Sequence, residues 1–452
     1  MKILLLRPPR RDSRDASLPV PPLGLTYIAA ELLALGHEVE LLDAVGLGIG
    51  WDELEGELRV RGPQLVGVGA MTPTADIAYR AATIAKGVAR WVVLGGPHPT
   101  ATGSEALEQC AAIDHLVVGE GEEVVGPYVE WLLSGAEGAP PPGVMARRAP
   151  FVEATISRPI GEIRPPARQL LEGASYHYLM ATRPGFATMI TSRGCPFRCS
   201  FCDKSVSGSR WRARSAGDVV DELEGLAASG VGFVNIYDDN FTLRRSRVVE
   251  ICEEIIERGV DIEWKCEGRV DGVDLPLLRL MARAGCRVIA YGVESANRES
   301  LARLRKDMTV EEVIEAFCAT REAGIRTMAY AILGIPGEGV DEVRRTARFV
   351  REIGADYVQF STLSAMPGTD LETMGAAVDV SGPLDSDLSR PTVTDLPPEE
   401  LSQLMREAWW GFYLRPAPMV RVAADAWASG ALGELARMAL RLTSYQVSSR
   451  IR

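Results

Sequence analysis

Three cysteines lie close together in one short segment of this 452-residue chain. Cys195, Cys199 and Cys202 occur in the run Arg-Gly-Cys-Pro-Phe-Arg-Cys-Ser-Phe-Cys, a loop that can wrap three thiolates around one small inorganic centre. Thiolates are the soft ligands that iron–sulfur clusters require. Three cysteines leave one iron of a four-iron cluster without a protein ligand, and an open position can bind a substrate, as in catalytic zinc sites. The spacing predicts a [4Fe-4S] cluster at this loop.

At the level of the residues, three alternatives to such a cluster stay open. A structural zinc site would need a fourth Cys or His nearby, and none follows within the loop. An electron-transfer cluster would need a fourth cysteine from elsewhere in the chain. Coincidental core cysteines fit poorly, because Arg198, Ser200 and Asp203 make the segment polar. The remaining cysteines are scattered in apolar runs, where we expect small buried side chains: Cys110, Cys252, Cys266, Cys286 and Cys318.

The cysteine loop directly follows an apolar run that reads as the first of six strands. Helical stretches separate the six runs, and parallel strands need such crossover connections. Six units of this kind predict a partial (β/α)6 barrel, with its chemistry at the carboxyl ends of the strands. The expected strands are 187–191, 233–237, 262–266, 288–291, 327–333 and 357–363, and the expected helices are 216–228, 246–258, 275–284, 310–323 and 341–353.

The N-terminal part of the chain shows a similar alternation of short apolar runs and helices. It predicts a doubly wound parallel sheet, a Rossmann-like α/β fold that binds ligands outside the carboxyl ends of its strands. The expected strands are 2–6, 38–42, 65–71, 91–94 and 116–118, and the expected helices are 25–35, 75–89, 105–111 and 123–133. The loops at the carboxyl ends of the last three strands are 71–74, 95–98 and 119–122.

A Gly- and Pro-rich stretch at 135–150 cannot continue regular structure and marks a boundary. We expect a Rossmann-like domain over residues 1–140, a linker over 141–183, a partial barrel over 184–395 and a helical C-terminal region over 396–452. The C-terminal region gathers aromatic residues, for which packing against the barrel is the favoured interpretation and a lid over an apolar substrate the alternative: Trp409, Trp410, Phe412 and Tyr413.

Composition narrows the class of protein further. With 46% hydrophobic residues the chain can bury real cores, and a net charge of −12 argues against a nucleic-acid partner bound through a basic surface. No apolar run reaches the roughly 18 residues of a membrane-spanning helix, and the N-terminus reads as a strand rather than a secretory signal. Eight cysteines without such a signal favour a reducing, cytoplasmic setting. Lysine occurs at only five positions, against 44 arginines, which we interpret as genomic composition.

The cysteine motif, its place after the first barrel strand and the six-unit barrel resemble the radical S-adenosylmethionine (SAM) enzymes. The N-terminal domain resembles the cobalamin-binding domain of the cobalamin-dependent subfamily, which includes class B methyltransferases and an anaerobic cyclase-like branch. The resemblance covers residues 1 to about 415. It implies that the iron without a cysteine ligand binds the amino and carboxylate groups of SAM, and that one-electron reduction then yields a 5'-deoxyadenosyl radical.

The resemblance also implies SAM contacts at the ends of successive barrel strands. Phe201 takes the place where the family sets an aromatic ring against adenine. The family's usual Gly-Gly-Glu is absent after strand two, but the acidic side chains there can still accept from an ammonium group. The implied SAM-binding residues are Phe201, Asp238, Asp239, Asn240, Arg269, Glu294, Ser295, Gly334 and Gly337.

For cobalamin, the resemblance points to the carboxyl edge of the N-terminal sheet. The commonest cobalamin motif, Asp-x-His-x-x-Gly, is absent, and many members of the subfamily likewise hold cobalt without a protein histidine. We therefore expect cobalamin to bind with no histidine ligand, although the domain having lost the cofactor remains an alternative. The expected contacts are Leu23, Gly24, Thr72, Pro73, Thr74, Gly95, Gly96, His98, Gly119, Glu120 and Gly121.

The favoured function is functionalisation of an unactivated carbon in a small molecule, most of all C-methylation through methylcobalamin. The alternative is a non-methylating cyclase, oxidase or rearrangement enzyme acting on a lipid, tetrapyrrole or sugar-derived metabolite; the Trp-Lys-Cys-Glu-Gly-Arg-Val-Asp run at 264–271 resembles the cyclase-like branch as well. A sensor without catalysis is a third hypothesis.

The resemblance implies an external one-electron reductant of flavodoxin or ferredoxin type. The mixture of Arg, Ala, Leu and Trp at 419–442 is compatible with contact to a membrane surface, which nothing else in the sequence supports.

Overall fold

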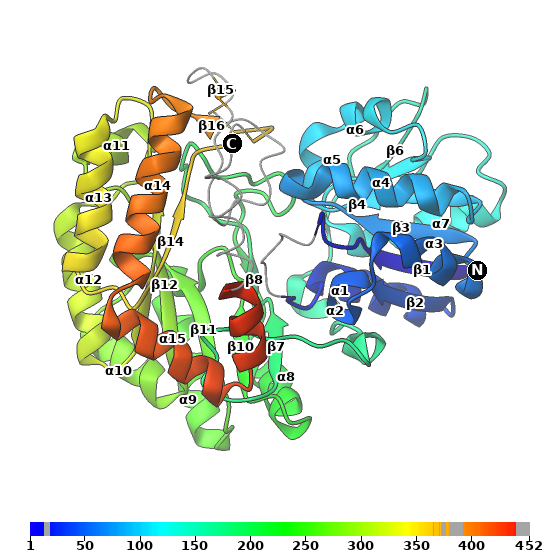
Figure 1. Ribbon diagram of the computed structural model, residues 1–452. Helices are drawn as coiled ribbons and strands as arrows, with labels where there is room; N and C mark the ends of the chain where they lie inside the picture. The colour runs from blue at the N-terminus through cyan, green and yellow to red at the C-terminus, as the bar shows by residue number, and fades with distance from the viewer. Residues whose placement is uncertain (13–18, 365, 370, 372–376, 379–391, 440–452) are drawn as a thin grey trace. The chain divides into compact units, whose positions relative to one another are not determined.

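The computed structural model describes residues 1–12, 19–364, 366–369, 371, 377–378 and 392–439 (Figure 1). The chain divides into two compact units. The first contains residues 1–12, Pro19–Tyr176 and the short segment Asp203–Gly208, and the second contains His177–Cys202 and the described residues from Ser209 onward. Each unit is built around its own parallel sheet.

The first unit is a six-stranded sheet in the order β2-β1-β3-β4-β5-β6. All neighbours are parallel except β6, which pairs antiparallel to β5. The strands are β1 Lys2–Arg7, β2 Glu38–Asp43, β3 Leu65–Gly69, β4 Trp91–Gly95, β5 His115–Val117 and β6 Val144–Ala146. The helices are α1 Leu23–Ala34, α2 Ala44–Leu47, α3 Trp51–Arg61, α4 Ala75–Lys86, α5 Pro97–Thr102, α6 Ser104–Gln109 and α7 Val125–Leu133.

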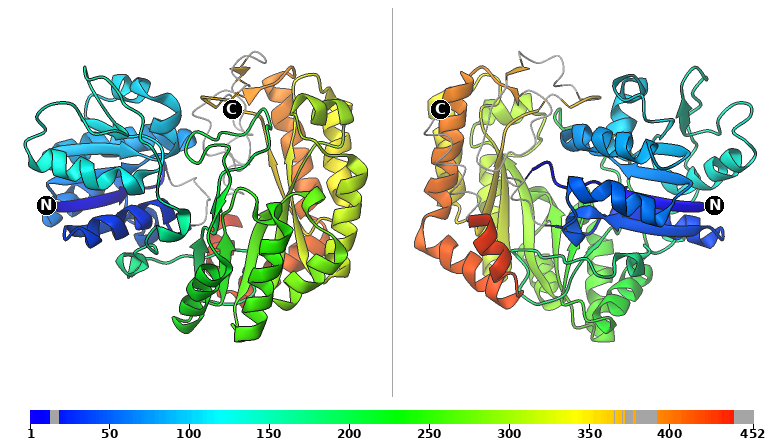
Figure 2. Two further views of the ribbon diagram at one scale, coloured as in Figure 1. Left: turned by 180° about the vertical axis from the view of Figure 1, so that it is seen from behind. Right: turned by 45° about the vertical axis from the view of Figure 1, so that its right-hand side comes forward.

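Helices cover both faces of this sheet (Figure 2). One core lies between the sheet and α3, α4 and α6, and a second lies between the sheet and α1 and α7. Because a parallel sheet has both faces buried, its strands are nearly continuous apolar runs, as in the fully buried stretch Ile3–Leu6 of β1. The sheet is therefore doubly wound, as expected.

The second unit holds a parallel six-stranded sheet in the order β14-β13-β12-β11-β10-β7. Its strands are β7 Phe186–Met189, β10 Phe233–Ile236, β11 Glu263–Gly268, β12 Cys286–Glu294, β13 Arg326–Ile332 and β14 Tyr357–Ser361. Two short antiparallel pairs accompany it: β8 Ser192–Arg193 with β9 Arg212–Ala213, and β15 Ala377–Val378 with β16 Thr392–Val393. The sheet is the expected partial α/β barrel.

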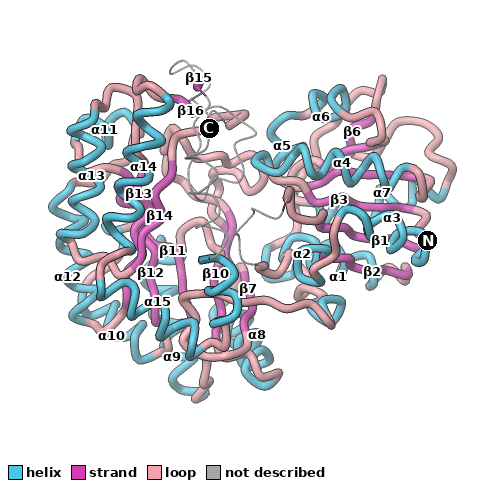
Figure 3. Tube along the Cα trace, in the orientation of Figure 1, coloured by secondary structure: helices cyan, strands magenta, loops and turns pink. Residues whose placement is uncertain are grey.

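Most helices of the second unit lie along one face of its sheet: α8 Ala216–Ala228, α9 Arg245–Arg258, α10 Leu275–Arg283, α11 Arg298–Arg303, α12 Val310–Glu322, α13 Val340–Glu352 and α14 Pro398–Tyr413 (Figure 3). Helix α15 Pro416–Ala428 packs on the opposite face, where Val422 belongs to a cluster with Val288, Ala290, Met328 and Tyr357. Capping boxes begin α8 at Ser215 and α12 at Thr309, and Gly259 in the left-handed conformation ends α9. These caps set where each helix begins or ends, and so where the chain turns between helix and strand.

Single-turn 3-10 helices follow several strands in both units. They are η1 Thr72–Thr74, η2 Gly121–Glu123, η3 Ile160–Glu162, η4 Arg168–Leu171, η5 Phe241–Leu243 and η6 Val270–Gly272. Four of them, η1, η2, η5 and η6, come directly after sheet strands, within the loops at the carboxyl edges. No helix in the described part of the chain has the length and apolar character needed to cross a membrane.

Several details differ from the sequence-based expectations. The first unit continues through β6 to Tyr176, past the boundary expected at residue 140. Helices α3 and α11 were not expected, and most of the polar stretch 381–398 lies outside the described residues. Cys318 was expected to be buried, and this was wrong: the buried face of α12 carries Val313, Ala316, Phe317 and Thr320, which leaves Cys318 on the exposed face.

The aromatic cluster of α14 packs against the barrel, as the favoured interpretation predicted. Phe412 is fully buried in the core between sheet and helices, and the Tyr413 hydroxyl donates to the Val358 carbonyl of β14 over 2.6 Å. Trp409 stacks on Tyr413, with 4.7 Å between the ring centroids. These residues therefore stabilise the helical layer.

Candidate functional site

The cysteine loop begins where β7 ends, and a buried carboxylate holds that point. Asp238 Oδ1 accepts from the backbone N–H groups of Thr191 (2.6 Å) and Ser192 (2.9 Å). Its Oδ2 accepts from the hydroxyl groups of the same two residues, over 2.6 Å from Ser192. Four donors occupy the acceptor sites of this carboxylate, so it holds the start of the loop in place, and its expected contact with SAM stays a prediction.

The two residues that follow Asp238 also accept hydrogen bonds through their side chains. Asp239 Oδ2 accepts from the N–H of Gly194 over 2.8 Å, immediately before the first cysteine of the motif. Asn240 is buried, and its Oδ1 accepts from the Thr242 hydroxyl. The Asp-Asp-Asn run was expected to contact SAM, whereas the structure shows its carboxylates positioning residues 191–194.

The other end of the motif is tied to the segment that follows α11. The N–H of Ser200 donates to the Leu304 carbonyl over 3.0 Å, and the Ser200 hydroxyl donates to the Arg303 carbonyl over 3.3 Å. The Phe201 ring packs against an apolar cluster formed by Leu304, Ile332, Ile335, Leu363 and Leu371. The loop is therefore held at both ends, and Phe201 lies beside the carboxyl ends of β13 and β14.

Two cations approach the loop from the ends of β11 and α11. The Arg269 guanidinium carbon lies 3.7 Å from the centroid of the Phe197 ring, while its nitrogens donate to both carboxylate oxygens of Asp271. The Lys306 ammonium lies 5.9 Å from the centroid of the Phe201 ring and 2.7 Å from Glu294 Oε1. Arg269 and Glu294, both expected to bind SAM, are thus brought to the cysteine loop, and each already has a partner of opposite charge.

The thiols of the loop differ in environment from the cysteines elsewhere in the chain. Burial raises the pKa of Cys199, whereas the nearby charges of Lys306 and Arg269 act to lower it. Burial also raises the pKa of Cys252 and Cys266, which lie in the apolar core between sheet and helices. Cys195, Cys199 and Cys202 are in no disulfide and are at least partly exposed. Within the described residues no three ligating side chains converge as a single metal ion requires.

The loops after β12 and β13 form a polar network around one buried carboxylate, Glu338. Its Oε1 accepts from the hydroxyl of Ser295 over 2.8 Å and from the hydroxyl of Ser300 over 2.7 Å. Ser295 was expected to contact SAM, and here it is fully buried in this network. Gly334 and Gly337 both have positive φ, and a Cβ on Gly337 would overlap the Arg303 guanidinium, so only glycine fits there.

In the first unit, the expected cofactor loops lie at one edge of the sheet because β3, β4 and β5 are parallel neighbours. The loops are joined by backbone bonds: Ala70 N–H donates to the Gly95 carbonyl over 2.9 Å, and His98 N–H donates to the Ala70 carbonyl over 3.2 Å. Leu23 and Gly24 begin α1, whose N-terminus faces the same edge. A Cβ on Gly24 or Gly119 would meet no atom within 4 Å, so these backbones are open to a ligand.

Among the remaining expected contacts of this edge, some are buried and others keep part of their surface exposed. Thr72, His98 and Glu120 are buried, whereas Pro73, Thr74 and Gly121 keep part of their surface exposed. The His98 ring lies inside the unit, with Nε2 2.6 Å from the hydroxyl of Tyr79. His37 precedes β2 and His115 begins β5, so both lie at the opposite, amino edge of the sheet. None of these three imidazoles is placed to ligate a metal at the carboxyl edge.

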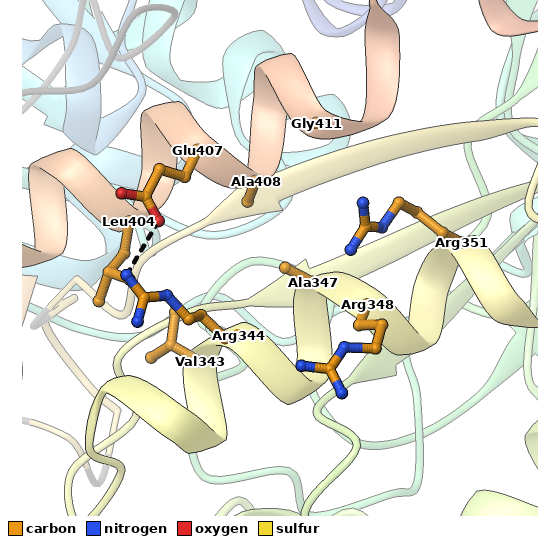
Figure 4. A pocket seen from close by; sticks show the side chains of 9 residues that line it. All are labelled: Val343, Arg344, Ala347, Arg348, Arg351, Leu404, Glu407, Ala408 and Gly411. Carbon is orange, nitrogen blue, oxygen red and sulfur yellow. Dashed lines mark hydrogen bonds and ion pairs between the residues drawn. The ribbon is translucent and has the colours of Figure 1, made fainter. Parts of the chain in front are cut away.

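A separate cavity of about 210 Å³ lies between α13 and α14 (Figure 4). The Arg344–Glu407 ion pair closes one end of it, and Arg348 and Arg351 also line it. It contains none of the expected site residues and lies in the helical layer, away from the strand ends.

Each unit of the chain matches a known protein family. The family model of the radical SAM superfamily matches residues 189–350, and that of the B12 binding domain matches residues 14–127. An uncharacterized methyltransferase of Pyrococcus horikoshii is 32% identical over 93% of this chain and 94% of its own length. The anaerobic magnesium-protoporphyrin IX monomethyl ester cyclase of Rubrivivax gelatinosus is 31% identical over 80% of this chain and 67% of its own length.

Solved structures show the same fold. The radical SAM methyltransferase TsrM of Kitasatospora setae superposes with a TM-score of 0.68 at 23% identity, covering 84% of this chain and 78% of TsrM. The cobalamin-dependent enzyme OxsB gives a TM-score of 0.72 at 16% identity, covering 93% of this chain and 70% of OxsB. The chain belongs to the radical SAM superfamily, in the group of enzymes that carry a B12 binding domain.

Two residues of the site were missed by sequence reasoning. Lys306 stands between Glu294 and the Phe201 ring, and Glu338 organises the loops after β12 and β13. A signal for Lys306 existed, because it is one of only five lysines in a chain that otherwise uses arginine. No comparable signal marks Glu338, since exposed and buried glutamates look alike in a sequence.

Proposed function

We propose that this protein is a cobalamin-dependent radical SAM enzyme that methylates an unactivated carbon of a small molecule. The observation that carries the proposal is the cysteine loop, which is fixed at both ends and faced by two cations, in a chain that also has a B12 binding domain. When bound, the [4Fe-4S] cluster and SAM supply a 5'-deoxyadenosyl radical, and cobalamin supplies the methyl group.

The residues of the loop fit a cluster of this kind. Cys195, Cys199 and Cys202 offer three thiols outside any disulfide, and Lys306 and Arg269 place positive charge near Cys199, against the burial that raises its pKa. Asp238 holds residues 191 and 192 at the start of the loop. Phe201 supplies an apolar ring next to the strand ends, a surface suited to adenine.

The first unit fits a corrin held without a histidine ligand. The exposed glycine backbones at Gly24 and Gly119 allow close approach of a large planar group, and Pro73 and Thr74 flank them at the same edge. The His98 ring is turned inward to Tyr79, and the other two histidines of the unit lie at the opposite edge. The groups that would hold the corrin at this edge are therefore the backbones of Gly24 and Gly119 with Pro73 and Thr74, rather than an imidazole.

Methylation is favoured over the alternative because several relatives are methyltransferases, among them the hopanoid C-3 methylase of Methylococcus capsulatus at 25% identity. Cyclisation or oxidation is the second candidate, supported by the likeness to the magnesium-protoporphyrin ester cyclase. Free thiols and an oxygen-sensitive cluster favour a cytoplasmic setting, with a flavodoxin- or ferredoxin-like donor as the electron source.

Anaerobic reconstitution tests the cluster. Wild-type protein should bind about four irons per chain and show iron–sulfur absorbance, and Cys199→Ala should lose both. Cys318→Ala is the matched control, because Cys318 is an exposed thiol outside the loop and should not affect iron content. An intact cluster in Cys199→Ala would contradict the ligand assignment.

Product analysis separates the two candidate reactions. Reduced, loaded enzyme turning over its substrate should accumulate S-adenosylhomocysteine together with 5'-deoxyadenosine if it methylates. Formation of 5'-deoxyadenosine alone would favour the cyclase or oxidase. Absence of both products would contradict the radical SAM assignment.

A further inference from the structure

Strand β11 places two charged side chains on the face of the sheet opposite the helices. Trp264 and Cys266 belong to the core between sheet and helices, so strand alternation turns Lys265 and Glu267 to the inner face. The Lys265 side chain is 1% exposed, and its ammonium forms an ion pair with Glu267 Oε1. The ammonium also lies 3.4 Å from Oδ1 of Asn235, a buried residue of β10. A buried ammonium is stable only beside such partners, so the three side chains form one connected polar network on the inner face of the sheet.

A third strand contributes to the same carboxylate. The Tyr330 hydroxyl of β13 donates to Glu267 Oε1 over 3.2 Å. This contact crosses β12, where Ala290 pairs with Glu267 and Gly292 pairs with Tyr330. The small side chain of Ala290 leaves room for Glu267 and Tyr330 to meet, whereas the space beside Gly292 is taken by Glu294 and Lys306.

The two oxygens of Glu267 are used unequally. The protein donors Lys265 and Tyr330 both reach Oε1, and no donor from the described residues reaches Oε2. A carboxylate offers about four lone-pair sites, so Oε2 keeps unused acceptor capacity. The Glu267 side chain is 21% exposed, against 1% for Lys265, so the carboxylate forms the accessible end of the pair. Tyr237, which directly follows β10, is 42% exposed nearby on the same face.

The charge of the network favours an uncharged ligand. Burial acts to lower the pKa of Lys265, but the charge and hydrogen bond of Glu267 together with the nearby Tyr330 and Tyr237 outweigh it and leave that pKa raised, so the ammonium stays charged at neutral pH. The pair is therefore neutral overall, and a second cation at Oε2 would add an unpaired charge in a largely buried place. Tyr330 also packs, together with Met180 and Val422 of α15, against a buried apolar cluster of the inner face: Val288, Ala290, Met328 and Tyr357.

We propose that Oε2 of Glu267 receives a hydroxyl or N–H donor of the substrate, while the partly exposed ring of Tyr237 contacts its carbon skeleton. The proposal rests on the proposed function, because it takes the inner face of the barrel as the place where substrate meets the radical. It defines the substrate class as uncharged molecules that join an apolar skeleton to a hydrogen-bond donor. Glu267 then binds and orients substrate without taking part in the radical step.

A matched pair of small probes tests this subsite. Phenol has a hydroxyl donor on an apolar ring, and anisole is the same ring with the donor methylated. Binding of each is measured by calorimetry or ligand-observed NMR on protein loaded with cluster and hydroxocobalamin. Wild type should bind phenol about fivefold or more tightly than anisole, the worth of one hydrogen bond to a charged group. Glu267→Gln should lose this preference, because its amide presents a donor to the phenol hydroxyl.

Two further variants guard against an effect on folding. Tyr330→Phe removes a donor from Oε1 only and should keep the phenol preference. The double variant Lys265→Met with Glu267→Leu removes both charges together, which buried pairs tolerate better than loss of one, and it should lose the preference. Equal affinity of wild type for the two probes, including no binding of either, would overturn the proposal. A preference that survives in both Glu267 variants would overturn it too.

The same samples distinguish this proposal from the proposed function. Iron content and the 5'-deoxyadenosine formed by dithionite-reduced wild type with SAM depend on the cysteine loop rather than on the Glu267 subsite. Loss of these two readouts in wild type with an intact phenol preference would contradict the function and leave the subsite standing.

Discussion

The guanidinium of Arg269 lies over the ring of Phe197, 3.7 Å from its centroid. Phe197 stands between the first two cysteines of the motif, so this stacking links the end of β11 to the middle of the loop. Asp271 holds the guanidinium in a bidentate pair from the other side. The loop is thus fixed at its two ends by hydrogen bonds and at its centre by a cation–π contact.

Replacement of Arg269 by lysine should shorten the lifetime of the cluster. Lysine keeps the charge but cannot stack on Phe197 while donating two parallel bonds to Asp271. We expect iron loss under air to become several-fold faster, measured by the decay of iron–sulfur absorbance. Arg279→Lys is the control, because Arg279 forms an exposed pair with Glu322 and its change should leave the decay unaltered.

Replacement of Asp238 by asparagine should destabilise the second unit and lower iron content. The amide group would present hydrogens to donors of Thr191 or Ser192, leaving buried groups without acceptors. We expect a loss of about 2–4 kcal/mol in the free energy of unfolding, measured with urea. Asp261→Asn, at a carboxylate that is 83% exposed, should change it little. An equal change in the free energy of unfolding of the two variants would contradict the role of Asp238 in holding residues 191 and 192.

The first unit should lose stability below neutral pH because of His115. Burial lowers the pKa of this imidazole, against the opposing charge of Asp114. The unfolded chain therefore binds the extra proton first, so stability falls as pH drops through about 6.5 and is flat above it. Melting temperatures at pH 7.5 and 5.5 measure the effect, and His115→Asn should reduce the difference. An unchanged difference in the variant would assign the pH dependence to another group.

The docking of α15 should depend on Asp425. This carboxylate is buried and bonds both the Tyr357 hydroxyl and the Arg326 guanidinium, which come from β14 and β13. Asp425→Ala should destabilise the protein by about 3–5 kcal/mol, because it leaves a half-buried guanidinium unpaired. Limited proteolysis should then cleave near α15 before the rest of the unit. Resistance equal to wild type would show that other contacts hold the helix.

Contact of the cofactor with Gly24 can be tested by added bulk. Gly24→Trp should reduce the hydroxocobalamin retained after gel filtration, because the site is open in the protein alone and a ring would occupy the space of the corrin. Gly56→Trp is the matched control, since Gly56 is an exposed glycine of α3 that also has no neighbour within 4 Å. Equal retention in the two variants would place cobalamin elsewhere.

Much of the fold was predictable because each strand is a short apolar run followed by an amphipathic helix. The cysteine loop was predictable because its spacing is local in sequence. The roles of Asp238 and Ser295 were not, because both depend on which loops meet at the sheet edge, and Ser295 meets Glu338 only through tertiary packing. The burial of Cys318 was predicted wrongly because α12 has apolar residues on its exposed face as well as on its buried face, and residue type alone does not say on which face a cysteine lies.

The exposed position of Cys318 has a practical consequence. Four of the eight thiols are buried, and three belong to the loop proposed to bind iron. In the loaded protein Cys318 is then the single sulfur open to alkylation, on the outer side of a rigid helix. A nitroxide or fluorophore attached there would form a spectroscopic ruler to the paramagnetic cluster, with one label per molecule and no engineered cysteine.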